Sequence, residues 1–598
     1  MHKNPLVDFL RHYGPIPAQD NMYDERIHEA RERAGVAPIE APPMRLGDVL
    51  GDLRAGGPRV VILTGTAGDG KTFHCRRAFE ELGGDAVEWA KGLKLVAVPL
   101  GDGRSAVIAK DLSEFTATEK EALLPRLAAA ANGHGTDAFL LAANDGQLVA
   151  SFRGWAAADQ ARQPLFREIE AMLVEGRQKS DRWRLSMYNL SREMHGALFD
   201  TLAGLIVNHP DWKHCCGCPA KDRCPILVNR DRLADGSLFR ERLAQVIDLA
   251  GANDHHLPIR HLLMLVVNIL LGVAGDGKSP LLNCKRSQRI EPKEATSPYS
   301  NALGLNVPER VRFQYQAFAA IDAFGIGKET SNVIDDLLVY GHIERKEDYA
   351  KAVSADPLFG EAAHRHSRAA YLAGDRSGTP DFLKSLEAQR QRLFFTLGAD
   401  LGGLDPWHLT VFRHAGEYLE FCASLREGRP PDKWTPRLVR GLNRTFTGMM
   451  LDVHADVLLC SAGGDGRSRV ARFLSHTLSV SRQRRAPYLS FDWAVGKATP
   501  RMVVIDPMAR PGEPSPGEIP LRLTHFEYLM RVSSGSLPAS FSRQCFEDFH
   551  DFKLKVIDRL DALFKDADDG FIRLEAVEAE ASGAARTKEF SFRVPTDD

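Results

Sequence analysis

Short apolar runs alternate with amphipathic stretches between residues 46 and 275. Residues 73–82 and 117–131 have apolar side chains at helical spacing, and each follows a short apolar run. The apolar runs that indicate buried strands are Val60–Leu63, Ala106–Ala109, Ala138–Ala143 and the stretch 183–190. This alternation is typical of βα units around a parallel sheet, so we expect an α/β domain over 46–275.

The rest of the chain divides by pattern into further segments. Residues 1–45 predict an N-terminal lead-in, with a helix over 23–34 before a proline-rich link. Residues 276–310 are polar and predict a linker, and 311–450 predict a helical domain. Residues 451–598 predict a mixed α/β domain with β-like runs, a helical stretch over 525–564 and a frayed tail after Glu580. The β-like runs are 456–461, 488–494, 501–505 and 520–523.

Composition excludes several classes of protein. The 598 residues are 44% hydrophobic and 26% charged, with 77 Lys and Arg against 79 Asp and Glu. These values exclude a disordered chain and a wholly basic nucleic-acid coat. The longest apolar run, 262–271, is half of the about 20 residues that span a bilayer, and no secretory signal is recognised. We expect a cytoplasmic protein without a membrane anchor.

A phosphate-binding loop follows the first apolar run. Residues 60–72 read VVILTGTAGDGKT, with the pattern GxxxxGK[ST] between a strand and a helix. In this pattern backbone amides and the helix N-terminus surround the phosphates of ATP, the lysine reaches the β- and γ-phosphates, and the hydroxyl binds Mg²⁺. The candidate nucleotide-binding residues are Gly65, Thr66, Ala67, Gly68, Asp69, Gly70, Lys71 and Thr72.

Residues 272–279, GVAGDGKS, match the same pattern a second time. Their context differs, because 259–271 reads as a helix rather than a strand and Pro280 follows at once. We therefore interpret this segment as a glycine-rich helix stop, while a second phosphate loop stays open as the alternative.

Carboxylates and an amide follow the next two apolar runs. Asp111 ends one run and is a candidate Mg²⁺ ligand, and Glu114 is placed to polarise an attacking water. The run 138–143 ends in Asn144 and Asp145, and Asp145 is a rival Mg²⁺ ligand. The sequence favours Asp111, and a solvated turn residue is the alternative for it. Arg260 begins a predicted helix and could bridge phosphate oxygens, or be an ordinary surface arginine.

Four cysteines crowd into residues 215–224. Cys215, Cys218 and Cys224 have the spacing Cx2Cx5C, which suits a thiolate-bound metal. Cys216, His214, His209 and Cys284 are candidates for a fourth ligand, and we place Cys284 in the set. Structural Zn²⁺ is the favoured interpretation, with an iron–sulfur cluster or unligated thiols as alternatives.

Basic segments in the second half could track a phosphate backbone. They are 440–448, interpreted as a polar loop, 463–469 and 482–485, together with Arg472. Phe446, Phe473, Tyr488 and Trp493 lie near them and could stack on bases, although such residues are more often core. The alternative for the segments is a solvated basic face, so DNA stays a possible partner only.

The order of these motifs resembles the AAA+ and STAND branches of P-loop ATPases. With the segments LTGTAGDGKT, KDLSE, LLAANDGQL, YNLS, CCGCPAKDRCPI, GLNRTFTGMM and HFEYLMRV, the chain resembles ATPases of bacterial anti-phage islands. The nearest of these is the F component of DNA-phosphorothioation-dependent restriction systems. The resemblance implies Asp111 as the Walker B carboxylate, Asn144 as sensor 1 and Arg260 as sensor 2. It also implies partner proteins of a defence complex and a possible homo-oligomer.

The predicted fold is therefore α/β, an AAA+-like P-loop NTPase with a parallel sheet and a helical lid. A mainly helical C-terminal region with a small β part completes it. The leading functional hypothesis is an ATPase that couples turnover to conformational change in a DNA-associated defence complex. The alternatives are a STAND-type switch that senses a protein trigger, a P-loop kinase, and a scaffold stabilised by nucleotide.

Overall fold

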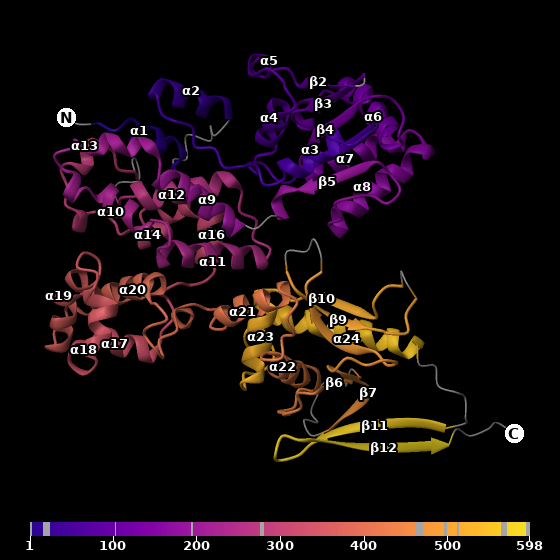
Figure 1. Cartoon of the computed structure of the whole chain (residues 1–598). Coiled ribbons are helices and arrows are strands. Elements are labelled where there is room, and N and C mark those ends of the chain that lie inside the picture. The colour runs from indigo at the N-terminus through magenta and orange to yellow at the C-terminus, as the bar shows by residue number, and fades with distance from the viewer. Residues whose placement is uncertain are drawn as a thin grey trace. The chain divides into compact units, whose positions relative to one another are not determined.

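The computed structural model describes residues 3–15, 24–101, 103–192, 195–274, 280–461, 471–494, 499–510, 513–563 and 571–593. The chain divides into two compact units, Met1–Thr410 and Val411–Asp598, which Figure 1 shows from indigo to yellow along the sequence. This division lies within the stretch 311–450 that the pattern predicts as one helical domain. Among the described residues, no helix has the length and apolar character needed to cross a membrane.

The first unit contains a mostly parallel sheet. Among its described residues, five strands lie in the order β2-β3-β4-β1-β5. β1 pairs in parallel with β4 and β5, and β3 pairs in parallel with β4. The edge strand β2 is antiparallel to β3, a hairpin that the sequence pattern did not predict. The strands are β1 (Arg59–Thr64), β2 (Leu95–Gly101), β3 (Arg104–Ala109), β4 (Ala138–Ala142) and β5 (Leu185–Asn189). The expected α/β architecture with a mostly parallel sheet is confirmed.

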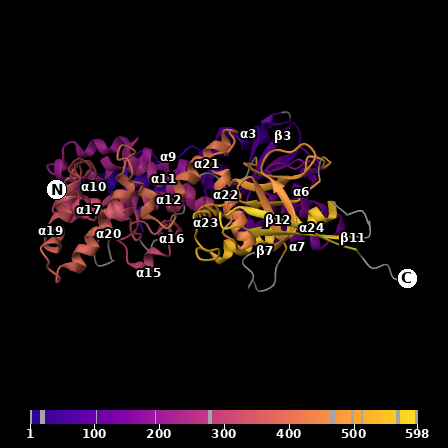
Figure 2. The ribbon, with the colours of Figure 1, turned by 90° about the horizontal axis from the view of Figure 1, so that it is seen from below.

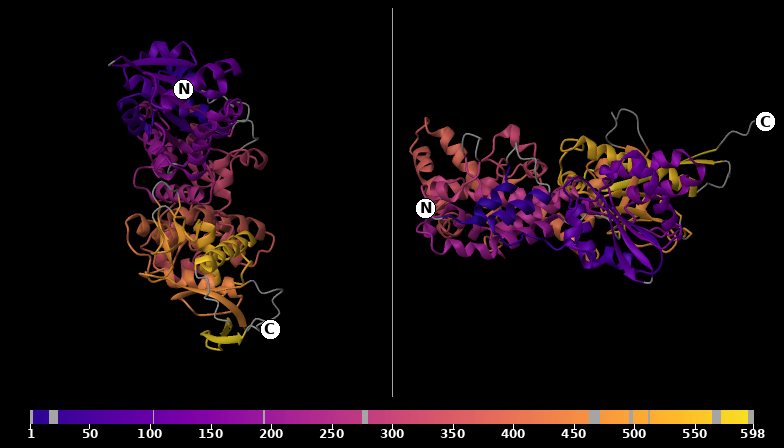
Figure 3. Two further views of the ribbon diagram at one scale, coloured as in Figure 1. Left: turned by 90° about the vertical axis from the view of Figure 1, so that its right-hand side faces the viewer. Right: turned by 90° about the horizontal axis from the view of Figure 1, so that it is seen from above.

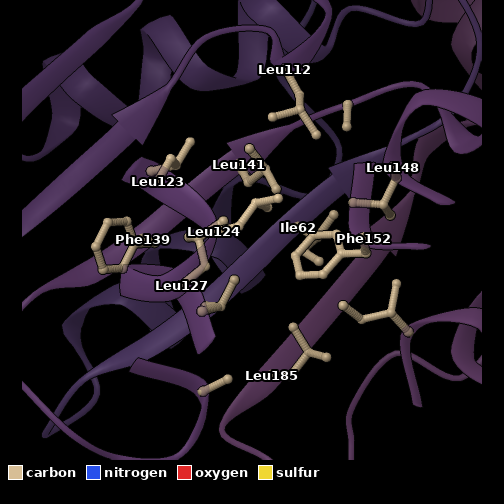
Figure 4. Packing of buried hydrophobic residues seen from close by; sticks show 14 of the residues in the cluster. Ile62, Leu112, Leu123, Leu124, Leu127, Phe139, Leu141, Leu148, Phe152 and Leu185 are labelled. Atoms are coloured by element: carbon tan, nitrogen blue, oxygen red, sulfur yellow. The ribbon is translucent and has the colours of Figure 1, made fainter. Parts of the chain in front are cut away.

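Helices cover both faces of this sheet, because its central strands are apolar on both sides. On one face, leucines of α6 and Phe152 of α7 pack against Ile62 and Leu141 of the strands (Figure 4). On the other face, Val49 and Phe79 pack against further strand residues. The helices are α3 (Leu46–Arg54), α4 (Lys71–Glu81), α5 (Ala86–Ala90), α6 (Ala117–Ala131), α7 (Asp145–Ala157) and α8 (Gln163–Glu175).

A helical part completes the first unit, and its centre is the apolar helix α12 (Ile259–Leu271). Nine residues of this helix are buried, eight of them in one run from Met264 to Leu271. Helices α9, α10, α14 and α16 pack around it, and Figure 2 shows α9, α11 and α12 together. The other helices are α1 (Pro5–Leu10), α2 (Asp24–Ala34), α9 (His195–Val207), α10 (Pro225–Arg232), α11 (Leu238–Ala252), α13 (Cys284–Ser287), α14 (Pro298–Ala302), α15 (Glu309–Arg312), α16 (Gln316–Asp322), α17 (Asn332–Glu344), α18 (Lys346–Tyr349), α19 (Glu361–Leu372) and α20 (Thr379–Thr396).

The predicted linker at 276–310 is folded over its described residues 280–310. Asn268 and Asn306 hydrogen-bond to each other at 2.9 Å, and Asn301 donates to the carbonyl of Gly272 at 3.0 Å. These amides are fully or almost fully buried. The side-chain amide nitrogens of Asn301 and Asn306, two of the polar residues that suggested a linker, thus donate hydrogen bonds inside the core. The prediction failed because a buried amide network and a solvated linker have the same composition.

The second unit combines a sheet with four described helices. Its described strands form a seven-stranded sheet in the order β10-β9-β8-β7-β11-β12, with β6 paired to β7. The strands are β6 (Asp456–Cys460), β7 (Ala471–Ser479), β8 (Tyr488–Asp492), β9 (Arg501–Ile505), β10 (Gly517–Pro520), β11 (Phe571–Ala579) and β12 (Ala585–Arg593). The helices are α21 (Ala415–Arg426), α22 (Thr435–Thr447), α23 (Leu523–Ser533) and α24 (Arg543–Leu563). The sheet is larger than the small β part that the sequence predicted.

Two predictions for this unit are wrong. The segment 440–448, expected as a polar loop, forms the last part of α22 together with its capping residue Gly448, and the apolar side of this helix packs on α23. The tail after Glu580, expected to fray, contains β12, which pairs with β11 along nine residues and forms the yellow hairpin in Figure 3. In both cases tertiary pairing gives order to a polar sequence that local pattern does not favour.

Candidate functional site

The phosphate-binding pattern forms a loop between β1 and α4. Gly65, Gly68 and Gly70 have φ values of 138°, 92° and 78°. Residues other than glycine rarely adopt such positive φ values. Gly70 caps α4, and Lys71 is the first residue of that helix. The loop therefore has the strand, tight turn and helix N-terminus that a phosphate site requires.

Lys71 is buried at the centre of this loop. Its Nζ donates to the carbonyl oxygens of Thr66 at 2.6 Å and Gly65 at 3.2 Å. Burial lowers the pKa of Lys71, while the nearby carboxylates of Asp69, Asp111 and Asp145 oppose that shift. The lysine thus lies among three acidic groups, and Thr72 beside it is exposed.

Asp111 and Glu114 lie just beyond β3. Asp111 is half-buried, and its Oδ1 accepts a hydrogen bond of 2.8 Å from the amide of Ser113. Asp111 also acts on the buried thiol of Cys75 in α4: burial raises the pKa of that thiol to about 12, and Asp111 adds to the shift. Glu114 is exposed three residues further on. The structure therefore brings Asp111 near Lys71 although β4 separates β3 from β1.

Asn144 and Asp145 follow β4, the strand next to β1. Thr64 donates its hydroxyl to Oδ1 of Asp145, and Nδ2 of Asn189 lies 3.4 Å from Oδ2. Both oxygens of Asp145 thus have donors on neighbouring strand ends. Asn144 is half-buried and precedes α7 without a capping hydrogen bond from its side chain. Asp111 is therefore better placed than Asp145 to bind a ligand, because a hydrogen bond to only one of its carboxylate oxygens is described.

Asp69 acts as a clamp for the loop, a role that sequence reasoning missed. Its Oδ2 accepts from the amide of Thr66 at 2.7 Å and the hydroxyl of Ser191 at 2.6 Å. Its Oδ1 lies 2.7 Å from Nε2 of His256. Burial alone would raise the pKa of Asp69, but the hydrogen bonds from His256, Ser191 and Thr66 outweigh burial and lower it. We name Asp69, Ser191 and His256 the loop clamp.

A second histidine lies beside the loop clamp. The rings of His195 and His256 are 5.3 Å apart. Burial, with a smaller effect from His256, lowers the pKa of His195 to about 4, so this ring is neutral at pH 7. The segment YNLS, in which β5 ends, includes Ser191 and was part of the family resemblance, but no sequence signal singled out His195.

The start of α12 closes one side of the loop. A pocket of about 260 Å³ is lined by Thr66 and Ala67 of the loop, by Pro258, Arg260 and His261, and by Gln314 and Gln316. A Cβ on Gly68 would lie 3.3 Å from Cβ of Pro258, and one on Gly70 would lie 3.1 Å from Cδ1 of Ile259. Arg260 thus lines the same pocket as the loop, as expected for a residue that contacts nucleotide phosphates.

The second phosphate-loop match lies mostly outside the described residues, which omit 275–279. Its first residue, Gly272, follows α12 and pairs with Leu281 in an isolated bridge. The predicted helix before the match is confirmed as α12.

The predicted cysteine ligands come together. Cys215, Cys218, Cys224 and Cys284 all line one cavity of about 20 Å³, whereas Cys216 is exposed. Burial raises the pKa of Cys215, Cys224 and Cys284, the last to about 11. Among the described residues, no three His, Cys, Asp or Glu side chains are grouped closely enough to hold one metal ion.

The basic segments of the second unit separate into half-buried arginines that bond to backbone carbonyls and arginines that are exposed. Arg444 donates to the carbonyls of Leu451 and Ser533, and Arg472 donates to the carbonyl of Thr447. These arginines therefore hold the fold together. Arg482, Arg484 and Arg485 are exposed, and 463–469 lies outside the described residues. Of the nearby aromatic residues, Phe446 and Tyr488 are buried, Phe473 is exposed, and Trp493 lies 4.2 Å from the guanidinium of Arg426.

Comparison of the chain with protein-family models, with curated proteins and with solved structures finds no match. The functional argument therefore depends on the residues and geometry of the site.

Proposed function

We propose that this protein is a P-loop ATPase whose nucleotide site is the loop 65–72. The observation that supports it is the position of Lys71. It begins α4, its ammonium lies inside the loop, and Asp69, Asp111 and Asp145 all influence its pKa. An ammonium, the loop amides and a helix N-terminus at one place suit a polyphosphate.

The surrounding residues fit the roles of an ATP-hydrolysing site. The exposed Thr72 hydroxyl and the Asp111 carboxylate would hold Mg²⁺, which neutralises developing charge on the phosphates. Lys71 would stabilise the γ-phosphoryl group as charge builds on it. Asn144 or the exposed Glu114 would orient water for attack on the γ-phosphorus, with ADP as the leaving group. Arg260 would contact the phosphates from the start of α12.

The cellular role rests on the resemblance to defence-island ATPases. On that basis ATP turnover in a cytoplasmic protein would change the conformation of a complex with partner proteins and DNA. Arg482, Arg484 and Arg485 are the exposed cations best suited to DNA phosphates. A second copy of the chain could supply further residues to the site.

A nucleotide-gated switch is the second candidate, and one observation favours it. Cβ atoms on Gly68 and Gly70 would lie closer to Pro258 and Ile259 than ordinary van der Waals contact allows, at 3.3 Å and 3.1 Å. A lid that packs this closely on the loop would slow the exchange of bound nucleotide. The switch would retain ATP for long periods and respond to a protein trigger.

The two candidates are separated by ATP release and turnover, measured on the same preparation of full-length protein. Release of labelled ATP that is fast relative to turnover, with turnover raised by duplex DNA, supports the ATPase in a DNA complex. Turnover that stays below one ATP per hour, with retained nucleotide and no response to DNA, would move the assignment to the switch.

A further inference from the structure

The strand β12 forms one edge of the sheet in the second unit (Figure 1). Among the described residues it pairs with β11 alone. The strand β11 pairs with β7 only over Glu575–Glu578, so its first part, Phe571–Leu574, also has β12 as its one partner strand in that part of the chain. Eight of the nine residues of β12 are exposed. An exposed edge strand of this length is a template for pairing with a further strand.

The backbone groups of alternate residues of β12 point to this free edge. At the turn of the hairpin the amide of Glu580 donates to the carbonyl oxygen of Ala584 at 2.9 Å. Hydrogen-bonded and non-hydrogen-bonded residue pairs alternate along an antiparallel pair of strands, and β11 and β12 keep one register throughout. The N–H and C=O groups of Glu589, Ser591 and Arg593 therefore lie on the side of β12 that is turned away from β11.

Exposed apolar side chains lie on one face of this hairpin. Residues directly opposite each other in a strand pair share a face. Leu574 is opposite Phe590, and Phe592 follows two residues later on the same face. Phe473 of β7 is opposite Ala576, two residues along β11 from Leu574. The exposed fractions are 56% for Phe473, 39% for Leu574, 42% for Phe590 and 54% for Phe592. The free edge of β12 thus borders an apolar strip.

The charges of β12 indicate which strand would fit this edge. Lys588 is already paired within the hairpin, because its Nζ donates to Glu578 at 2.9 Å. Glu589 and Arg593 lie on the face opposite to the phenylalanines, and Glu589 is directly opposite Glu575 of β11. Like charges directly opposite each other destabilise a strand pair. A strand that placed a cation beside Glu589 and a carboxylate beside Arg593 would therefore be stabilised at this edge.

A second copy of β12 supplies both charges when it runs antiparallel to the first and the pair is centred on Ser591. Glu589 of each copy is then opposite Arg593 of the other. Phe590 is opposite Phe592, an aromatic pair that stabilises neighbouring strands. The outward N–H and C=O groups of both copies also face each other in this register. A pair centred on Phe590 would lose the ion pairs, and one centred on Glu589 would place two carboxylates together.

We propose that the protein forms a two-fold dimer in which the β12 strands of two copies pair antiparallel about Ser591. The sheet of the second unit would then continue from one copy into the other. A two-fold axis uses every contact twice, so the dimer would contain two Glu589–Arg593 ion pairs and two Phe590–Phe592 pairs. This inference goes beyond the proposed ATPase function and does not depend on it.

The test is the mass of the full-length protein, measured by sedimentation equilibrium across the micromolar range. We expect a species of twice the 66.1 kDa of one chain. Glu589→Arg and Arg593→Glu should each weaken dimerisation at least about tenfold, because each variant places like charges opposite each other at two positions. Lys555→Glu reverses the charge of an exposed lysine on α24 and is the matched control, which should dimerise as the wild type does.

Two further measurements test the register itself. An equimolar mixture of Glu589→Arg and Arg593→Glu should recover the dimer, because opposite charges meet again at both positions. Oxidation of Ser591→Cys should join two chains through a disulfide, since Cα atoms about 5.5 Å apart in a hydrogen-bonded pair lie within disulfide range. The wild type, which has nine cysteines of its own, is the control for that reaction.

Different results would overturn the proposal. A wild-type protein that stays monomeric across the micromolar range would exclude a second copy as the occupant of this edge. A dimer that persists unchanged in both single variants would be held by another surface. Single variants that stay monomeric when mixed, or a Ser591→Cys protein that is cross-linked no more than the wild type, would exclude the register about Ser591.

Discussion

Asp69→Ala would remove the carboxylate that three donors share at the phosphate loop. Asp69 is 3% exposed, and it accepts from Thr66, Ser191 and His256 at 2.6–2.7 Å. Hydrogen bonds to a charged group contribute about 1.5–3 kcal/mol each. Water can reach Ser191 and His256 after the change, so the net loss should be below the sum, about 3 kcal/mol. In a unit of this size that lowers the midpoint of thermal unfolding by about 5 °C.

Asp69→Asn is the matched control, because it keeps the shape and an acceptor oxygen. The asparagine oxygen can accept from Thr66 and Ser191, and its amide can donate to His256 in the other tautomer. We expect a loss of about 1 kcal/mol, from the charge alone. Because the pKa of Asp69 is lowered in the folded protein, its carboxylate stabilises the fold above the ordinary pKa near 4. That contribution is lost as the pH falls below this value, and Asp69→Asn should lack this acid dependence.

The functional assay for both variants is ATP binding by calorimetric titration. A loop without its clamp must be ordered by the nucleotide, so Asp69→Ala should bind ATP at least about tenfold more weakly, a change of about 1.4 kcal/mol. Asp69→Asn should stay within about threefold of wild type. The reasoning is refuted if Asp69→Ala binds ATP and unfolds as wild type does, or if the two variants are equally impaired.

Three further predictions concern the site and the two units. Asp111→Asn should bind ATP normally and lower its turnover by roughly 100-fold, whereas Asp145→Asn should mainly lower thermal stability; the reverse result would make Asp145 the Mg²⁺ ligand. Burial, helped by Arg368, lowers the pKa of His364 to about 4. As the pH falls, this histidine therefore takes up a proton at a higher pH in the unfolded chain than in the folded protein. The free energy of unfolding should fall by about 3 kcal/mol as the pH is lowered from 6.5 to 4. Denaturant titrations of His364→Gln should show a flatter pH dependence, and an unchanged one would contradict the assignment. Gly441→Ala would place a Cβ 2.4 Å from the carbonyl oxygen of Leu529, so calorimetry should show the second unit losing about 1–3 kcal/mol; an unshifted transition would show that α22 and α23 can separate freely.

Local signals predicted the elements that carry the phosphate loop. The helices over 117–131 and 259–271 agree in both bounds with α6 and α12, because capping residues and proline mark their ends in the sequence. The strand before the loop was predicted from its apolar run, and its parallel pairing follows from the βα alternation.

Features that depend on tertiary contacts were beyond the sequence. The loop clamp joins Asp69 to Ser191 and His256, which are 122 and 187 residues away. The sequence offered Cys284 only as one of several candidates for the fourth cysteine ligand. The fold of 280–310 places it at the same cavity as Cys215, Cys218 and Cys224. The order of β12 comes from its pairing with β11, since its own sequence is charged. Periodicity carries no information about such long-range partners.

The most direct test of the central claim is steady-state ATP hydrolysis by the full-length protein beside Lys71→Ala and Lys278→Ala. The account predicts Mg²⁺-dependent turnover that Lys71→Ala abolishes and Lys278→Ala retains, with each variant folded as judged by circular dichroism. Turnover that survives in Lys71→Ala, or that is lost only in Lys278→Ala, would contradict the assignment of the nucleotide site to residues 65–72.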